Sequence, residues 1–118
     1  MGLQLGFYIG RIRHTVTMTY QTALVLEALA AGRHHGFDIM DATDLPSGTV
    51  YPILRRLDAD GLVRSRWERD AVARREQRPP RRYYELTAAG EAKRAEARTR
   101  YRALEALAPF MGRRWKPA

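Results

Sequence analysis

Residues 46–62, PSGTVYPILRRLDADGL, predict one short helix with a defined beginning and a defined end. Gly61 is expected to take a left-handed conformation after the helix, so that Leu62 folds back onto Leu57, as in a Schellman stop. The buried face is predicted by apolar residues that recur at the i, i+3, i+4 and i+7 spacing of a helix. These residues are Val50, Ile53, Leu54 and Leu57.

The first turns of this helix carry Gly48 and Pro52, two residue types that ordinarily disfavour helices. Proline loses little there, because the first N–H groups of a helix have no partner within it, and glycine lets another surface approach the backbone. Free N–H groups at a helix start also attract phosphate. We therefore predict a contact surface opposite the apolar face; the alternative is that Gly48 and Pro52 only shape a turn. The predicted contact residues are Ser47, Gly48, Thr49, Tyr51, Pro52, Arg55 and Arg56.

The charge of the chain indicates a class of partner. The 118 residues carry a formal net charge of +8 with 21 basic residues, and the excess lies in the second half. Residues 62–82 are the densest block, with eight arginines and three acidic residues. Such a block can bind a polyanion by neutralising phosphates and releasing counterions. The alternative is a solvated, arginine-rich surface.

Two further helices are predicted before the one at 46–62. The first covers about residues 19–31, with Thr19 as its cap and Gly32 as its stop. Its buried side is predicted to hold Ala23, Leu24, Leu26 and Leu29. The second covers about residues 36–42 and offers Phe37, Ile39 and Met40 to the core.

Two strands are predicted after the helices, at residues 62–68 and 81–86, because apolar and polar side chains alternate there. Helices followed by a hairpin predict a mainly α fold with a small β-hairpin, a winged helix-turn-helix. The twelve residues 69–80 are expected to be the loop of the wing, whose arginines suit a minor groove or its flanking phosphates. The alternative is a solvated loop. The predicted wing contacts are Arg74, Arg75, Arg78 and Arg81.

Residues 87–108 predict one long helix that Thr87 caps and Pro109 ends. A helix of this length cannot bury its apolar side on so small a domain, which predicts a homodimer; the alternative is a solvated helix. The predicted interface residues are Ala88, Ala92, Ala95, Thr99, Tyr101, Leu104 and Leu107. The expected division of the chain is a leader at 1–17, a winged helix-turn-helix domain at 18–86, the dimerisation helix at 87–108 and a tail at 109–118.

Two motifs resemble the PadR family of bacterial transcriptional regulators. The first is SGTVYP at residues 47–52, followed by Leu54, Arg56, Leu57 and Gly61, and the second is RPPRRYYELTAAG at residues 78–90. The resemblance runs from about Met18 to Ala108. It implies a dimer, DNA binding by the helix and the wing, and repression that a small ligand relieves. Gln77 departs from the pattern, since a glycine often stands there, and the leader at 1–17 has no counterpart in the family.

Enzymatic and metal-dependent functions have little support in the sequence. There is no cysteine, and neither Ser47 nor Ser65 lies in a nucleophile-elbow context. His34 and His35 are adjacent, so they cannot share a helix face as metal ligands do at i, i+4. No glycine-rich phosphate loop is present, and we expect no enzyme activity, no metal and no cofactor. No apolar run approaches the length of a membrane span and no secretory signal is recognisable, so we expect a cytoplasmic protein with no membrane partner.

Two functions remain. The first is a dimeric, sequence-specific repressor that binds double-stranded DNA at a palindromic operator and is released by a small aromatic effector near the dimer seam. Aromatic residues that could line that site are Trp67, Tyr101, Phe110 and Trp115. The second is a winged helix used as a protein-interaction module, in which the arginines only keep the surface solvated. Retention on DNA that falls steeply with salt favours the first.

Overall fold

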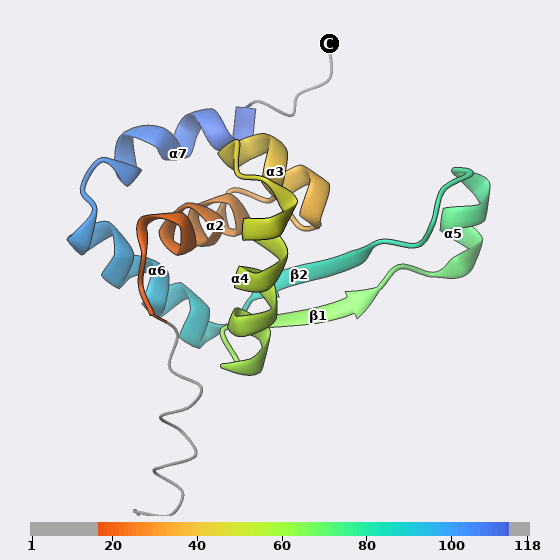
Figure 1. The fold of residues 1–118 in the computed structure, drawn as a ribbon, viewed down its shortest axis with the longest axis horizontal. Coiled ribbons are helices and arrows are strands. Elements are labelled where there is room, and N and C mark those ends of the chain that lie inside the picture. The colour runs from red at the N-terminus through yellow and green to blue at the C-terminus, as the bar shows by residue number, and fades with distance from the viewer. Residues whose placement is uncertain (1–16, 114–118) are drawn as a thin grey trace, which may run out of the picture.

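The computed structural model describes residues 17–113, and their elements follow one another as helices, a hairpin and two more helices (Figure 1). Helices α2, α3 and α4 lie together, and the two-stranded antiparallel hairpin projects away from them. This confirms a mainly α, winged helix-turn-helix fold. The elements are α2 (Tyr20–Ala30), α3 (Gly36–Thr43), α4 (Ser47–Ala59), β1 (Val63–Trp67), α5 (Asp70–Arg75), β2 (Arg82–Leu86), α6 (Ala88–Arg100) and α7 (Leu104–Arg113).

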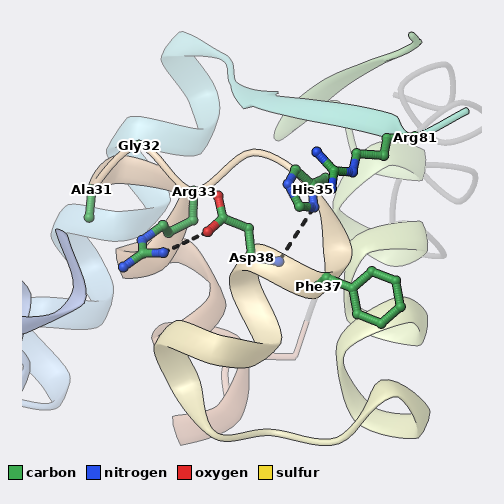
Figure 2. Close-up of a pocket in the computed structure, with 7 residues that line it drawn as sticks. All are labelled: Ala31, Gly32, Arg33, His35, Phe37, Asp38 and Arg81. Carbon is green, nitrogen blue, oxygen red and sulfur yellow. Dashed lines mark hydrogen bonds and ion pairs between the residues drawn. The ribbon is translucent and has the colours of Figure 1, made fainter. Parts of the chain in front are cut away.

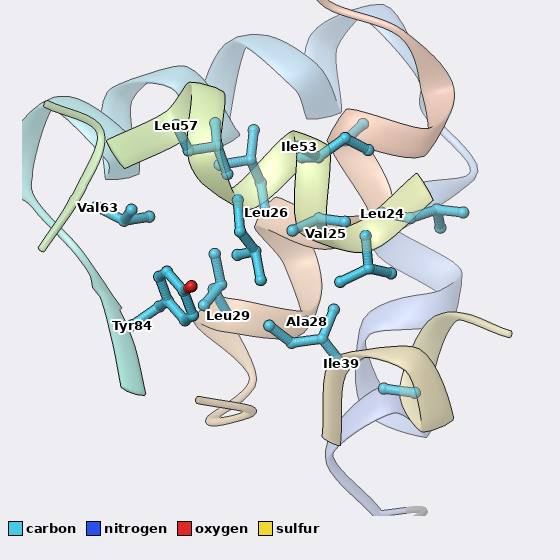
Figure 3. Close-up of a cluster of buried hydrophobic side chains, with 14 of the residues drawn as sticks. Leu24, Val25, Leu26, Ala28, Leu29, Ile39, Ile53, Leu57, Val63 and Tyr84 are labelled. Atoms are coloured by element: carbon cyan, nitrogen blue, oxygen red, sulfur yellow. The ribbon is translucent and has the colours of Figure 1, made fainter. Parts of the chain in front are cut away.

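Helix α2 forms the centre of the core (Figure 3). Thr19 caps it as predicted, since its side chain accepts a hydrogen bond from the N–H of Thr22 at 3.1 Å. Every residue from Thr22 to Leu29 is buried, rather than one side only. The reason is that α3, α4, α6, α7 and β2 all pack around this helix.

Helix α4 and its end match the prediction. Its apolar face is buried, with exposures of 0 to 3% at Val50, Ile53, Leu54 and Leu57. Beyond the helix, Gly61 has a φ of 74° and donates to the carbonyl of Asp58 at 3.1 Å, while Leu62 donates to the carbonyl of Leu57 at 2.9 Å. These two bonds are those of a Schellman motif.

Helix α3 corrects one expectation about the core. Ile39 is fully buried and Met40 packs against the core, but Phe37 is 68% exposed. Two residues along a helix are separated by about 200°, so Phe37 points away from the side that buries Ile39.

The C-terminal region also differs from the prediction, because the single helix expected over 87–108 is two helices. Helix α6 ends at Arg100, and α7 folds back across α2 and α3 (Figure 1). The break lets Leu104 and Met111 reach the core, where their exposures are 0 and 3%, and sets the ring of Tyr101 against that of Tyr20 at 5.4 Å. A straight helix would carry these side chains into solvent.

Helix α7 also continues through Pro109 instead of ending there. Its far end is held by Arg33, a buried residue between α2 and α3 whose Nε donates to the carbonyl of Met111 at 2.8 Å. Burial of Met111 and this cationic cap favour the helix beyond the proline, although proline removes one hydrogen bond.

Helix α6 is joined to α2 by a buried carboxylate. Glu27 is 1% exposed and accepts two hydrogen bonds from the guanidinium of Arg98, at 2.7 and 3.0 Å. Arg94 lies 3.6 Å from the same carboxylate.

None of the helices in the described range 17–113 is both long and apolar enough to cross a membrane.

Candidate nucleic-acid interface

The outward side of α4 carries the residues that the sequence assigned to contact. Arg55 and Arg56 are exposed in the middle of the helix, on the side away from the buried stripe. Ser47 and Gly48 are exposed at the helix start, and the other three are half-buried: Thr49, Tyr51 and Pro52. The surface therefore combines two cations with an open helix N-terminus.

The start of α4 is open to an approaching surface. Its first residue follows Pro46, which provides no side-chain cap. A Cβ added at Gly48 would meet no atom of the described chain within 4 Å. Contacts within the described residues therefore do not require glycine at this position, and the space beside its backbone is available to a partner. Pro52 lies inside the helix without ending it.

The ring of Tyr51 packs onto Gly36 of the neighbouring helix α3, a contact that the sequence did not predict. A Cβ added at Gly36 would lie 2.0 Å from the hydroxyl oxygen of Tyr51, so the ring lies directly over the first residue of α3. Tyr51 is consequently half-buried and packs against the core. The pairing fixes α3 against α4 and leaves Tyr51 at the edge of the contact surface.

The hairpin carries a small folded unit at its tip, which corrects the expectation of a twelve-residue loop at 69–80. Helix α5 spans Asp70–Arg75, with an acidic residue in its first turn and two basic residues in its last turn, as the helix dipole favours. Ala73 is 2% exposed on its inner side. Gln77 then takes a φ of 57°, the left-handed region that glycine enters most readily. This explains why glycine suits the position.

Glu68, which no pattern in the sequence singled out, closes the base of this unit. Its Oε1 accepts from Nη1 of Arg78 at 2.6 Å and from the backbone N–H of Arg81 at 3.2 Å. Its Oε2 accepts from Nη2 of Arg78 at 2.8 Å and from the hydroxyl of Tyr83 at 3.2 Å. The hydrogen bond from Arg78 is the main reason that the pKa of Glu68 falls to about 2, and the carboxylate is therefore charged at neutral pH.

The four arginines that the sequence assigned to the wing lie in different surroundings. Arg74 and Arg75 are exposed on α5. Arg78 is half-buried in the bidentate pair with Glu68, and Arg81 is half-buried just before β2. Only the first two present their side chains freely at the tip.

A groove of about 310 Å³ lies between the start of α3, α4 and the base of the wing. Trp67, at the end of β1, is 61% exposed beside it, and the guanidinium of Arg82 lies 5.3 Å from the centre of its ring. The groove thus joins the outward side of α4 to the hairpin. Its lining residues are His35, Gly36, Phe37, Tyr51, Trp67, Arg78, Pro79, Pro80, Arg81 and Arg82.

A second hollow, of about 400 Å³, adjoins the first on the side of α2 (Figure 2). Arg33 and Asp38 form an ion pair of 2.6 Å in it. His35 faces Arg81 there, and its Nδ1 accepts from the N–H of Asp38 at 3.4 Å. Burial, reinforced by the charge of Arg81, lowers the pKa of His35 below its ordinary value. Within residues 17–113, no three acidic or histidine side chains are arranged to hold a metal ion.

The residues predicted for a dimer interface divide into two groups. The small residues of α6, namely Ala88, Ala92, Ala95 and Thr99, are exposed, as is Leu107 on α7. Leu104, by contrast, is fully buried in the core of its own chain, and Tyr101 packs against Tyr20. Trp115 lies outside the described residues, as do residues 1–16 of the expected leader.

Comparison with known structures finds the same fold in transcription regulators. A PadR family regulator from Clostridium difficile R20291 gives a TM-score of 0.61 at 21% identity, over 75% of this chain and 94% of that one. A PadR-like transcription factor from Bacteroides fragilis gives 0.58 at 26% identity, over 76% and 87%. A MarR family regulator gives 0.57 at 23% identity, over 90% and 65%.

The comparison with curated proteins found no match. The model of the transcriptional regulator PadR-like family matches residues 25–96, which include α3, α4, the hairpin and most of α2 and α6. This match covers more than half of the chain. The chain therefore belongs to the PadR-like family of transcriptional regulators.

Proposed function

We propose that this protein is a homodimeric repressor that binds a palindromic operator in double-stranded DNA, in the cytoplasm, and is released by a small aromatic effector. The observation that carries the proposal is the groove in which the outward side of α4 meets the base of an arginine-rich wing. Helix α4 would enter the major groove, and the wing would lie along the adjacent backbone or minor groove.

The two elements are assigned different roles. Arg55 is exposed in the middle of α4, where its guanidinium would reach a base edge, a contact that depends on sequence. Arg74 and Arg75 are exposed on the short helix α5, and they would neutralise phosphates whatever the sequence. The open start of α4, with Ser47, Gly48 and Thr49, would receive a further phosphate.

The test is a titration of operator and random DNA at several salt concentrations, after genome-wide capture of bound DNA has identified the operator. Arg55→Ala should weaken operator binding by about 1–3 kcal/mol and random binding much less. Arg74→Ala or Arg75→Ala should weaken the binding of operator and random DNA by similar factors. Either substitution should also lower the slope of log affinity against log salt by about one.

Arg102→Ala is the matched control, because Arg102 is exposed in the connection between α6 and α7 and its loss changes the net charge equally. Figure 1 shows that this connection lies away from the hairpin. The substitution should leave both affinities nearly unchanged. Equal weakening of both DNAs by Arg55→Ala would contradict the assignment of that residue. If the unmodified protein shows no salt-dependent affinity for DNA, the alternative of a protein-interaction module is favoured.

The dimer is proposed to form along α6. Its exposed small residues at positions 88, 92, 95 and 99 share one face at helical spacing, which permits close approach of a second helix. Ala92→Glu should shift the protein toward monomer in sedimentation experiments. Ala89→Glu is the matched control, since Ala89 is also exposed but lies about 100° around the helix from the stripe. An unchanged dimer in Ala92→Glu would contradict this interface.

The effector site is proposed beside α7. A groove of about 280 Å³ is lined there by Tyr20, Leu24, Leu107, Phe110 and Met111, together with residues 42–44. Trp67 lies on the hairpin instead, so it is left out of this site. A screen of planar aromatic compounds should find one that releases DNA from the protein but not from Phe110→Ala. Release that Phe110→Ala does not alter would place the effector elsewhere.

A further inference from the structure

The wing of this protein is closed by one carboxylate. Glu68 follows β1 directly, and Arg78 lies at the other end of the segment that holds α5. Glu68 is 7% exposed, and its two oxygens accept four hydrogen bonds from three residues on the returning side of the wing. A carboxylate with this many donors is fully satisfied, and its orientation is fixed.

We propose that Glu68 is the positioning residue of the wing, and that Arg78 serves as its counter-ion instead of binding DNA. This inference rests on the proposed DNA-binding function, since it assigns the DNA contacts of the wing to Arg74 and Arg75. Glu68 would hold these two arginines in place. The inference also gives Arg78 a role other than the one that the sequence suggested.

Arg78 holds the segment that carries α5 through both its backbone and its side chain. Residues 69–77 lie between the two ends of the ion pair, and the N–H of Arg78 donates to the carbonyl of Ala73 at 3.2 Å. The same residue therefore holds α5 through its backbone and Glu68 through its side chain. Movement of Arg78 away from Glu68 would release α5, and Arg74 and Arg75 with it.

The guanidinium of Arg78 already has hydrogen-bond partners within the wing. Its Nη1 and Nη2 both bind Glu68, at 2.6 and 2.8 Å, and Nη1 also donates to the carbonyl of Pro79 at 3.2 Å. These bonds use three of the five N–H groups of the guanidinium, so a phosphate could bind both Nη atoms on the edge that faces Glu68 only by displacing the carboxylate. Arg74 and Arg75 need no such exchange, because both are exposed at the tip.

Substitution of Glu68 should change DNA affinity in one direction if only its charge matters, and in the other direction if it positions the wing. This difference makes the inference testable. Glu68→Gln removes one negative charge from the hairpin, which by itself should strengthen DNA binding. However, glutamine has one acceptor oxygen where the carboxylate has two, so it cannot hold all four donors. If Glu68 positions the wing, Glu68→Gln should weaken operator binding roughly tenfold.

Glu85→Gln is the matched control for charge. Glu85 lies on the same hairpin, where it is exposed and 3.7 Å from Arg64, and its substitution removes the same charge. It should leave DNA affinity unchanged or slightly higher. Equal effects of Glu68→Gln and Glu85→Gln would overturn the inference.

Substitutions of Arg78 separate positioning from direct phosphate contact. Arg78→Lys keeps the charge but loses the bidentate geometry, so positioning predicts weakening as large as that of Glu68→Gln. A direct phosphate contact predicts that lysine preserves most of the affinity. In the Glu68→Gln background, Arg78→Ala should have no further effect, and a further loss with a salt slope lower by about one would overturn the inference.

Limited proteolysis tests the role of Glu68 without DNA, so that a failure of this inference can be distinguished from a failure of the proposed function. Trypsin cuts after arginine, so cleavage at Arg74 and Arg75, followed by mass spectrometry, reports the order of the wing. Cleavage there should be faster in Glu68→Gln and Arg78→Lys than in Glu85→Gln, with the melting temperature of the helical core unchanged. If the unmodified protein binds no DNA but Glu68→Gln is cleaved faster, the proposed function is refuted and the role of Glu68 in the wing is retained. If cleavage is unchanged in Glu68→Gln, that role is overturned.

Discussion

Gly90 of α6 lies against the carbonyl oxygen of Leu62, just beyond the end of α4, so closely that an added Cβ would be 2.0 Å from that oxygen. Thr87 reinforces the same junction, because its hydroxyl donates to the carbonyl of Gly61 at 2.7 Å and its N–H to that of Leu62 at 3.0 Å. The end of the proposed recognition helix and the start of the proposed dimerisation helix thus form one tightly packed joint. The separation of two recognition helices in a dimer would depend on it.

Gly90→Ala should destabilise the protein by about 1–3 kcal/mol, because a backbone oxygen cannot move aside as a flexible side chain would. The sign of the effect is informative, since alanine in place of glycine inside a helix ordinarily stabilises by about 0.5–1 kcal/mol. Urea unfolding measures the change. A neutral or stabilising result would show that α6 can move away from the carbonyl of Leu62 without a loss of stability.

Gly48→Ala should separate folding from function. A Cβ at Gly48 meets no atom of the described chain within 4 Å, so the free energy of unfolding should stay the same or rise slightly. Operator binding should nevertheless weaken, because the added methyl occupies space that we assign to DNA. Unfolding in urea and DNA titration of the same sample measure the two effects. Unchanged affinity would mean that DNA does not approach this part of α4 closely.

Local patterns in the sequence predicted the framework of the fold. The stripe from Val50 to Leu57 and the stop at Gly61 determine α4 through contacts within one helix and its end. Helix α2 and the hairpin were also predictable, because capping and alternation act between residues a few positions apart.

Contacts between distant residues determined what the sequence could not predict. The break at Tyr101 depends on burial of Leu104 and Met111 against α2, which outweighs the local preference for a continuous helix. The Glu68–Arg78 pair joins residues ten positions apart across a segment without a repeating pattern. The need for glycine at position 36 depends on Tyr51, which belongs to another helix and lies directly over it.

Arg98→Leu should destabilise the protein, because it leaves the buried carboxylate of Glu27 with Arg94 alone, at 3.6 Å. Loss of one partner of a buried ion pair costs about 3–5 kcal/mol, and we expect about 2 kcal/mol here, since Arg98 is a third exposed and Arg94 remains. Chemical unfolding measures this difference.

Two further variants control for the loss of charge. Arg100→Leu removes an exposed cation from the same helix and should cost at most about 0.5–1 kcal/mol, through its contact with the ring of Tyr101. The double variant Glu27→Met, Arg98→Leu should recover much of the stability, because apolar residues replace both members of the pair. A double variant no more stable than Arg98→Leu would show that packing, not the unpaired charge, is responsible.

His35 should make the stability of the protein depend on pH just below neutrality. Its Nδ1 caps α3 by accepting from the N–H of Asp38, and it can do so only while that nitrogen is unprotonated. The pKa of His35 is lowered by burial first, then by the charge of Arg81. The folded state therefore resists protonation more than the unfolded chain does.

For a group whose pKa is lowered on folding, the stabilisation is complete above the ordinary value of 6.5 and is lost as the pH falls through the lowered value. The free energy of unfolding should therefore decrease between pH 7.5 and pH 5.5. In His35→Asn, which retains a capping side chain but cannot titrate, that decrease should be smaller. The difference between the two proteins at each pH isolates His35 from its charged neighbours Arg81, Asp38, Arg78 and Glu68, which both proteins contain. Parallel curves for the two proteins would show that His35 takes up a proton as readily in the folded state as in the unfolded chain.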